Sequence, residues 1–279
     1  MADNTEELLE KIRNSPSYAL AEEDTDFLTR PELRPVRIQL ELLKPEMTFV
    51  ENGVQSTICA FGGTQIIPKD QAEEQVAQAE AAAAAAPDNK KAQRELLRAR
   101  NRLKKSKYYD HARDFARLVS STCQTNGKCD YVIMTGGGPG IMEAANRGAH
   151  DANAKSIGLN ITLPDEQDPN AYITPELCFQ FHYFAIRKMH FLLRAKALVV
   201  FPGGFGTLDE LFDALTLRQV GRMQDIPIIL YGREYWDPVI DFQYLADEGV
   251  CRDEHLDLID YAETPEEAWK IIEDFHKGR

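Results

Sequence analysis

The stretch Ala197–Phe212 constrains the fold of this chain more than any other. It opens with five apolar residues, Ala197–Phe201, which are too few for a helix and typical of a strand buried on both faces of a sheet. Proline and glycine then interrupt regular structure, and a helical pattern follows from Thr207. The interrupting residues are Pro202, Gly203, Gly204 and Gly206. A strand, a glycine loop and a helix N-terminus together make a site for an anion, most naturally a phosphate.

Two carboxylates, Asp209 and Glu210, follow about one helical turn beyond this loop. We expect Thr207 to cap the helix and both acids to lie in its first turn. Acids there interact favourably with the helix dipole by about 0.3–1 kcal/mol, so their presence has a purely structural explanation. A phosphate site gains nothing from negative charge, however, which indicates a separate chemical task for the pair.

Two more expected strands are each followed by glycine. Ser56–Phe61 precedes a Gly-Gly-Thr turn, and Tyr131–Met134 precedes a longer glycine run. Because ligands of open α/β sheets bind outside the carboxyl ends of the strands, both loops are candidates for phosphate contact. The residues concerned are Gly63, Thr64, Gly137, Gly138 and Gly140. For Gly63 and Thr64, a turn without chemistry is nearly as good an explanation.

The second of these loops belongs to neither of two common nucleotide motifs. Glu143 occupies the position of the third glycine of the dinucleotide fingerprint, and the lysine of a Walker loop is missing. Glu143 is either a first-turn acid of the following helix or a carboxylate of the ligand pocket.

Strands alternate with helices over residues 56–279, which predicts an α/β fold. We expect a doubly wound, Rossmann-like parallel sheet with helices on both faces, preceded by an N-terminal extension over residues 1–55. That extension either packs on the main domain or is partly disordered. Residues 69–106 join an acidic and a basic helical run and predict an inserted helical hairpin, either a solvated arm or a contact for oligomerisation or regulation. Further strands are expected over 156–161, 177–183, 226–231 and 256–261, and a helix over 235–248.

Composition restricts the class of partner. The net charge of −13 argues against nucleic acid and anionic membranes, since both attract Lys and Arg. Five scattered cysteines without CxxC spacing predict neither a disulfide framework nor a metal site. The acidic N-terminus resembles no signal peptide, and no apolar run approaches the ~20 residues of a membrane span. We therefore expect a soluble, cytoplasmic protein.

A pair of cations, Arg187 and Lys188, lies near the start of a helix expected over 184–196. Cations there are mildly unfavourable for the helix dipole, so Arg187 needs another reason to be present. Either it forms a surface salt bridge or it belongs to the site, because this helix leads directly into the strand Ala197–Phe201.

Three motifs together resemble the LOG family, the cytokinin riboside 5′-monophosphate phosphoribohydrolases, long described as lysine decarboxylases. They are Gly136-Gly137-Gly138-x-Gly140-x-Met142, the pair Arg187-Lys188, and Pro202-Gly203-Gly204-x-Gly206-Thr207-x-x-Glu210. The resemblance implies hydrolysis of a nucleoside 5′-monophosphate, such as AMP or cytokinin riboside monophosphate, to free base and ribose 5-phosphate. It also implies a homodimer or larger homo-oligomer, and no metal or organic cofactor. The extension and the hairpin are absent from compact members of the family, which leaves the subunit arrangement open.

The resemblance, the chemistry of the reaction and the position of the loops at the ends of the strands together assign roles to residues. Glu210 is the expected principal catalytic carboxylate, Asp209 its helper, and Arg187 a catalytic or substrate-orienting cation. The expected substrate-binding residues are Gly63, Thr64, Gly137, Gly138, Gly140, Glu143, Lys188, Gly203, Gly204, Gly206 and Thr207. A carboxylate suits this reaction because it stabilises an oxocarbenium-like sugar and accepts a proton from the attacking water.

Two other functions compete with this one. A nucleotide-binding or sensing protein would keep the phosphate loops without chemistry, but it has no need of Glu210 beside an anionic ligand. An amino-acid decarboxylase would need pyridoxal phosphate on a lysine, and the nearest lysines, Lys188 and Lys196, lie in no recognisable cofactor context.

Overall fold

The computed structural model describes residues 2–125, 129–163 and 168–277. The chain divides into two compact units, Met1–Lys44 and Pro45–Arg279. The first unit holds α1 (Ala2–Arg13), α2 (Thr25–Leu28) and the beginning of α3 (Arg34–Glu51), which continues into the second unit. Short 3-10 helices lie at Pro16–Tyr18 and Pro31–Leu33.

A seven-stranded parallel sheet forms the centre of the second unit, in the order β4-β3-β2-β1-β5-β6-β7. Its strands are β1 (Thr57–Phe61), β2 (Val132–Thr135), β3 (Ser156–Ile161), β4 (Cys178–Phe181), β5 (Ala195–Val200), β6 (Ile228–Tyr231) and β7 (Ile259–Ala262). β1, β2 and β6 are buried along their whole length, as apolar runs of this kind predict. The doubly wound α/β fold is confirmed.

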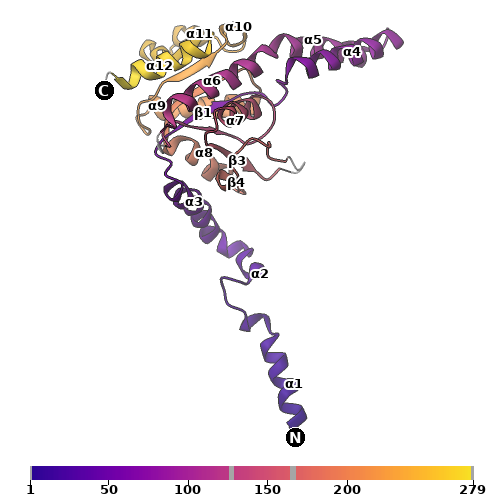
Figure 1. The fold of residues 1–279 in the computed structure, drawn as a ribbon, viewed down its shortest axis with the longest axis vertical. Coiled ribbons are helices and arrows are strands. Elements are labelled where there is room, and N and C mark those ends of the chain that lie inside the picture. Colours follow the sequence, from indigo (N-terminus) through magenta and orange to yellow (C-terminus); the bar gives the residue numbers. More distant parts are fainter. Residues whose placement is uncertain (1, 126–128, 164–167, 278–279) are drawn as a thin grey trace. The chain divides into compact units, whose positions relative to one another are not determined.

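Helices cover both faces of this sheet (Figure 1). Ile58 and Ala60 of β1 belong to a core with α6 (Lys107–Cys123), α7 (Ile141–Asp151) and α12 (Pro265–Lys277). Side chains alternate along a strand, so Phe61 points the other way, and its ring lies 4.9 Å from that of Phe191 on α8 (Phe184–Leu193). The remaining helices are α9 (Phe205–Gln219), α10 (Arg233–Trp236) and α11 (Phe242–Asp247), with 3-10 helices at Pro175–Leu177 and Asp253–Leu258. In the described ranges, no helix is long and apolar enough to cross a membrane.

Two boundaries differ from the sequence-based expectation. The units divide at 44/45 rather than 55/56, because the end of α3 joins the core: Phe49 is fully buried, with its ring 5.5 Å from that of Phe179. The single helix expected over 235–248 is wrong. It is interrupted after Trp236, and α11 starts anew where the Asp241 carboxylate accepts a hydrogen bond from Tyr244 N at 2.9 Å.

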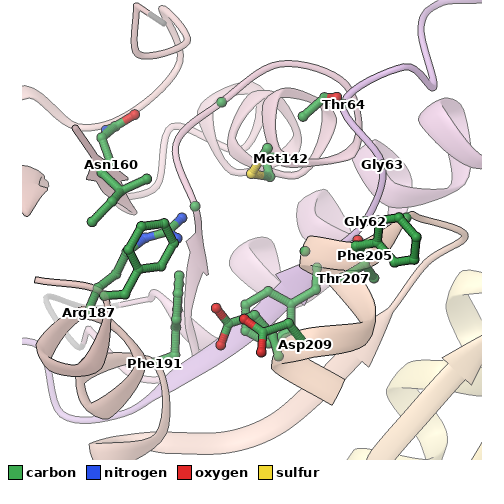
Figure 2. A pocket seen from close by; sticks show the side chains of 18 of the residues that line it. Gly62, Gly63, Thr64, Met142, Asn160, Arg187, Phe191, Phe205, Thr207 and Asp209 are labelled. Atoms are coloured by element: carbon green, nitrogen blue, oxygen red, sulfur yellow. The ribbon is translucent and has the colours of Figure 1, made fainter. Parts of the chain in front are cut away.

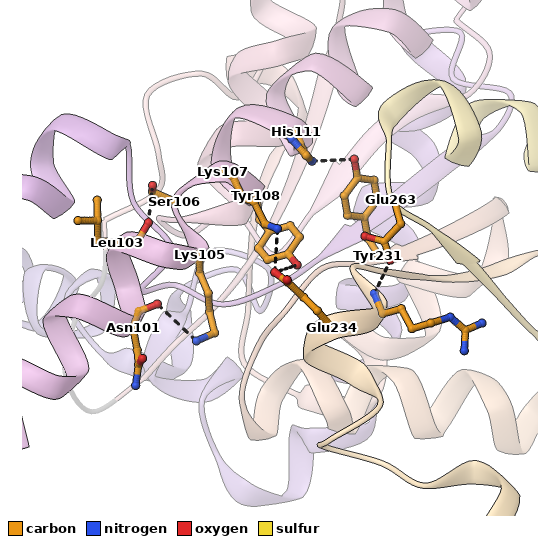
Figure 3. A network of polar contacts seen from close by, with 11 residues as sticks. Asn101, Leu103, Lys105, Ser106, Lys107, Tyr108, His111, Tyr231, Glu234 and Glu263 are labelled. Carbon is orange, nitrogen blue, oxygen red and sulfur yellow. Dashed lines mark hydrogen bonds and ion pairs between the residues drawn. The ribbon is translucent and has the colours of Figure 1, made fainter.

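The inserted segment forms two helices, α4 (Lys69–Ala85) and α5 (Lys90–Lys105), that lie side by side in Figure 1. An ion pair of 2.9 Å between Arg100 and Glu80 links them. Figure 3 shows where the hairpin joins the sheet domain: Lys107 pairs with Glu234 at 2.7 Å, and the Tyr108 hydroxyl donates to the same carboxylate at 3.0 Å. These contacts tie the beginning of α6, which directly follows the hairpin, to α10. From α5 itself, the Lys105 ammonium lies 5.8 Å from the centre of the Tyr235 ring.

The strand order reverses between β1 and β5, which are neighbours in the sheet. Ligands of doubly wound sheets bind at such a reversal, outside the carboxyl ends of the strands. The fold thus places the loops after β1 and β5 at the expected binding position.

Candidate active site

Backbone hydrogen bonds join the three glycine loops. Phe201 N donates to Phe61 O at 2.8 Å and Gly63 N to Pro202 O at 2.9 Å, which ties the loop after β1 to the loop after β5. Ile141 N donates to Gly63 O at 3.2 Å, which adds the loop after β2. The three loops singled out in the sequence therefore meet.

These loops border a cavity of about 420 Å³, a volume typical of small-molecule sites. Figure 2 shows Asn160 and Arg187 on one side of it and Thr64, Thr207 and Phe205 on the other. The sequence-predicted residues that line it are Gly63, Thr64, Gly138, Arg187, Gly204, Gly206, Thr207, Asp209 and Glu210. The other lining residues are Phe61, Gly62, Gly136, Met142, Asn160, Ile161, Leu163, Phe184, Phe191 and Phe205.

The remaining predicted residues do not line the cavity. They are Gly137, Gly140, Glu143, Lys188 and Gly203. The Glu143 carboxylate accepts a hydrogen bond of 2.6 Å from the Tyr109 hydroxyl, which is a structural contact between α7 and α6. Gly140 has a φ of +72° and packs on Gly63 O, and a side chain at Gly203 would overlap Thr207, so both glycines shape the loops. Substrate contact by these five residues stays a prediction.

Helix α9 begins earlier than the sequence indicated. Its N-cap is Gly204, so Thr207 lies inside the first turn, and Asp209 and Glu210 lie beyond it. The expectation that Thr207 caps the helix is therefore wrong, because Phe205 and Gly206 already adopt helical geometry. The free N–H groups of the first turn consequently belong to Phe205, Gly206 and Thr207, all of which line the cavity.

Glu210 is the cavity's most perturbed carboxylate. Its side chain is only 12% exposed. Burial raises the pKa of Glu210 to about 7, with Lys188 and Arg187 acting to lower it and Asp209 and Asp213 to raise it. Near neutral pH this carboxyl group is therefore able both to hold and to release a proton.

Arg187 approaches the cavity from α8. Its Nε donates to Leu159 O at 2.7 Å, and its guanidinium lies 5.1 Å from the centre of the Phe191 ring. Burial lowers the pKa of Arg187, while the Glu210 carboxylate opposes that shift. A guanidinium remains charged in any such setting, so the cavity holds a fixed, poorly hydrated cation.

Lys188, the next residue, contacts carboxylates on α9 instead of the cavity. Its Nζ lies 2.9 Å from Asp209 Oδ2, 3.8 Å from Glu210 Oε2 and 3.9 Å from Asp213 Oδ2. Burial acts to lower the pKa of Lys188, but the Asp209 hydrogen bond and the three negative charges leave it above its ordinary value. Its position fits a cation that holds Asp209 and Glu210 in place.

The apolar part of the cavity was not predicted from the sequence, although helical spacing contains a signal for it. Phe184 and Phe191 lie three residues before and four residues after Arg187, so they share its face of α8. Phe205 is 92% exposed at the start of α9, and Phe184 is 51% exposed. Two exposed aromatic rings therefore border the cavity, where a planar ligand can bury them.

Comparison with known proteins agrees with the motifs. Residues 142–272 match the family model described as "Possible lysine decarboxylase". The chain is 27% identical over 177 residues to cytokinin riboside 5′-monophosphate phosphoribohydrolase LOG3 of Arabidopsis thaliana, which covers 62% of this chain and 77% of that protein. The resemblance to the LOG family is confirmed.

A second LOG-family relative is the probable cytokinin riboside 5′-monophosphate phosphoribohydrolase LOGL2 of Oryza sativa subsp. japonica, 26% identical over 52% of this chain and 59% of that protein. Among solved structures, the Moco carrier protein from Chlamydomonas reinhardtii aligns at 16% identity with a TM-score of 0.43, over 80% of this chain and 99% of that chain. That likeness supports no conclusion about what this chain binds. The LOG-family relatives support a hydrolase.

Proposed function

We propose that this chain hydrolyses the N-glycosidic bond of a nucleoside 5′-monophosphate, of the AMP or cytokinin riboside monophosphate type, to free base and ribose 5-phosphate. The observation that carries the proposal is the largely buried carboxylate of Glu210, with a pKa of about 7, in the same cavity as the Arg187 guanidinium. Burial disfavours the charged form of a carboxylate, so a carboxylate with a pKa raised in this way favours a chemical role over a purely structural one.

The phosphate binds at the N-terminus of α9 in this proposal. The free N–H groups of Phe205, Gly206 and Thr207 supply donors and the positive end of the helix dipole. The net charge of −13 gives no general attraction for anions, so this local geometry has to capture the phosphate. Thr64, from the loop after β1, supplies a hydroxyl beside the same cavity.

The chemistry then follows from the charges around the sugar. Breaking the bond between C1′ and the base nitrogen leaves positive charge on the sugar, which the Glu210 carboxylate stabilises. Water forms the new bond to C1′, and Glu210 accepts its proton. The base departs with the electron pair of the broken bond, and Arg187 stabilises the negative charge that develops on it. The base finally takes up the proton that Glu210 accepted from water.

The competing functions have weaker support. A decarboxylase that forms a Schiff base needs a lysine with a lowered pKa, whereas the pKa of Lys188 is raised and its Nζ contacts carboxylates. A protein that only binds nucleotides gains nothing from a buried carboxylate beside an anionic ligand.

A panel of nucleoside 5′-monophosphates, each incubated beside its plain nucleoside, tests the proposal. Chromatography is expected to detect free base from at least one nucleotide and none from its nucleoside. The reason is that a nucleoside lacks the phosphate by which the N-terminus of α9 binds the substrate. If every nucleotide remains intact while some raise the melting temperature, the chain is a binding protein.

The pH dependence of base release tests the state of Glu210. Because the ionised carboxylate is the active form, kcat is expected to rise with pH through about 7 and to level off above it. In Lys188→Met, a cation that lowers the pKa of Glu210 is lost, so the rise is expected to move to higher pH. An unchanged pH profile in this variant, or activity that falls through pH 7 in the natural protein, would contradict this assignment.

Gly206 offers a test of the phosphate position. It lies in α9, and a Cβ at this position would meet nothing within 4 Å, so Gly206→Ala is expected to raise the free energy of unfolding by about 0.5–1 kcal/mol. The same methyl group would meet a phosphate at the first turn, and nucleotide affinity is expected to fall by about tenfold or more. Denaturant unfolding and calorimetric titration measure the two effects. Unchanged affinity would place the phosphate elsewhere.

A further inference from the structure

The peptide group between Gly203 and Gly204 lies between β5 and α9 and belongs to neither element. Gly204 is the N-cap of α9, with a φ of −95° and a ψ of −153°, and it lines the cavity. Glycine on both sides lets a peptide group turn over at little cost, because a positive φ is as accessible to glycine as a negative one. A contact from outside the loop therefore has to select one orientation.

Hydrogen bonds hold three successive carbonyl groups of this loop. Pro202 O accepts from the loop after β1 at 2.9 Å, and Gly204 O accepts from within α9 at 3.0 Å. Between them, Gly203 O accepts from the Tyr235 hydroxyl at 2.5 Å. Over the described ranges, no other hydrogen bond reaches Gly203 O. The middle carbonyl group therefore depends on one side chain, which comes from α10.

Helix α10 keeps Tyr235 in place beside the loop. The next residue, Trp236, is fully buried, and its Nε1 donates to Val200 O at 3.2 Å, at the end of the strand that leads into the loop. The Tyr235 and Trp236 rings meet edge to face, with their centres 5.1 Å apart. Glu234, the preceding residue, pairs with Lys107 of α6 at 2.7 Å (Figure 3). The hydroxyl therefore reaches the loop from a helix that is tied to both β5 and α6.

The direction of the Gly203 carbonyl group fixes the direction of the Gly204 N–H group. Within the described ranges no peptide bond is cis, and in a trans peptide the C=O and N–H bonds point in opposite directions. Gly204 lines the cavity, whereas Tyr235 does not. With Gly203 O directed at Tyr235, the Gly204 N–H points the other way, towards the cavity. In the part of the chain that the structure describes, this N–H has no hydrogen-bond acceptor.

We infer that Tyr235 is a positioning residue for the phosphate: its hydroxyl orients the Gly203–Gly204 peptide group so that the Gly204 N–H joins the three free N–H groups of the first turn of α9 as a fourth donor. With the peptide group reversed, Gly203 O would face the phosphate and repel it, since a carbonyl oxygen only accepts hydrogen bonds. The inference rests on the proposed function, because it requires a phosphate at this helix terminus. It adds a residue outside the cavity that controls substrate affinity.

Tyr235→Phe removes the hydroxyl and keeps the ring. In calorimetric titrations with AMP, or with the nucleotide that the panel selects, this variant is expected to bind about tenfold more weakly, the contribution of one hydrogen bond to a charged group. Both chains in the titration carry Glu210→Gln, so that the nucleotide is not consumed. The corresponding nucleoside, which has no phosphate, is expected to bind both chains equally.

The division of the effect between KM and kcat separates positioning from damage to the site. The phosphate is bound equally in the ground state and in the transition state, so a lost phosphate contact raises KM and leaves kcat unchanged. With Glu210 in place, Tyr235→Phe is therefore expected to raise KM about tenfold, with kcat within about twofold of the natural chain. A disturbed active site would lower kcat instead.

Tyr108→Phe is the matched control. The Tyr108 hydroxyl donates to the Glu234 carboxylate at 3.0 Å, so this variant loses a phenolic hydrogen bond to the same short helix but none to the loop. Its nucleotide affinity and its KM are expected to stay those of the natural chain. A tenfold loss in Tyr108→Phe as well would show that the effect comes from α10 as a whole, and would overturn the role of the Tyr235 hydroxyl.

The other outcomes distinguish this inference from the proposed function. If the natural chain binds the nucleotide and Tyr235→Phe binds it equally well, the inference is wrong and the proposed function stands. Equal weakening of nucleotide and nucleoside would also overturn the inference, because the hydroxyl would then support the cavity in general. A natural chain that binds no nucleotide of the panel would overturn the proposed function, and with it any role of Tyr235 in phosphate binding.

Discussion

Glu210→Gln is expected to lower the rate of base release by about 10²–10⁴-fold, the contribution typical of a positioned general base. Glutamine keeps the size of the side chain but neither accepts the proton of the attacking water nor carries charge against the oxocarbenium-like sugar. The phosphate contacts at the N-terminus of α9 are untouched, so nucleotide affinity is expected to change little. Chromatographic assay of free base and calorimetric titration with the same nucleotide separate the two quantities.

The neighbouring carboxylate provides the control for this variant. The Asp209 side chain is 59% exposed and pairs with Lys188 at 2.9 Å, whereas the Glu210 side chain is 12% exposed. Asp209→Asn removes the same charge one residue away and is expected to cost about tenfold or less, because solvent screens an exposed carboxylate. Near-normal turnover in Glu210→Gln would show that the catalytic carboxylate has been assigned wrongly.

Arg187→Gln is expected to lower kcat by about 10²–10³-fold, the loss typical of removing one donor from a charge-stabilising site. The glutamine amide is able to keep the hydrogen bond to Leu159 O. A loss of activity in this variant therefore reports the loss of the positive charge and not a disturbed fold. Removing the guanidinium also removes a charge that lowers the pKa of Glu210, and the pH at which activity rises is expected to increase. Steady-state rates over a pH series measure both effects.

Arg187→Lys separates charge from geometry in the same position. An ammonium keeps the charge but has no planar fork to reach Leu159 O and the cavity together, so an intermediate rate is expected. If Arg187→Gln retains a kcat within about threefold of the natural chain, Arg187 does not stabilise the leaving base.

The sequence predicted the sheet and the three loops well for one physical reason. Strands buried on both faces are short apolar runs, and glycine at the carboxyl end of such a run marks a loop that a ligand approaches closely. β1, β2 and β5 each carry this signal, and the reversal of strand order brings their loops together. The positions of Arg187 and Glu210 in one cavity follow from that arrangement.

The role of Lys188 could not be predicted in the same way. Spacing places it beside Arg187 on α8, but its contact with Asp209 depends on how α8 and α9 approach each other. The Glu143 carboxylate contacts Tyr109, which is 34 residues earlier on another helix, and no local pattern encodes that pair. The sequence predicts a later start for α9 because glycine disfavours helix, whereas Gly206 adopts helical geometry in the first turn of α9.

The most direct test of the proposed reaction is the identity of its products in one sample. Incubation of AMP, or of the nucleotide that the panel selects, is expected to give free base and ribose 5-phosphate in equal amounts, with the phosphorus NMR signal remaining that of a phosphate ester. Glu210→Gln, measured beside it, is expected to give neither product at a comparable rate. Release of inorganic phosphate with an intact nucleoside, or no product from any nucleotide, would contradict cleavage of the N-glycosidic bond.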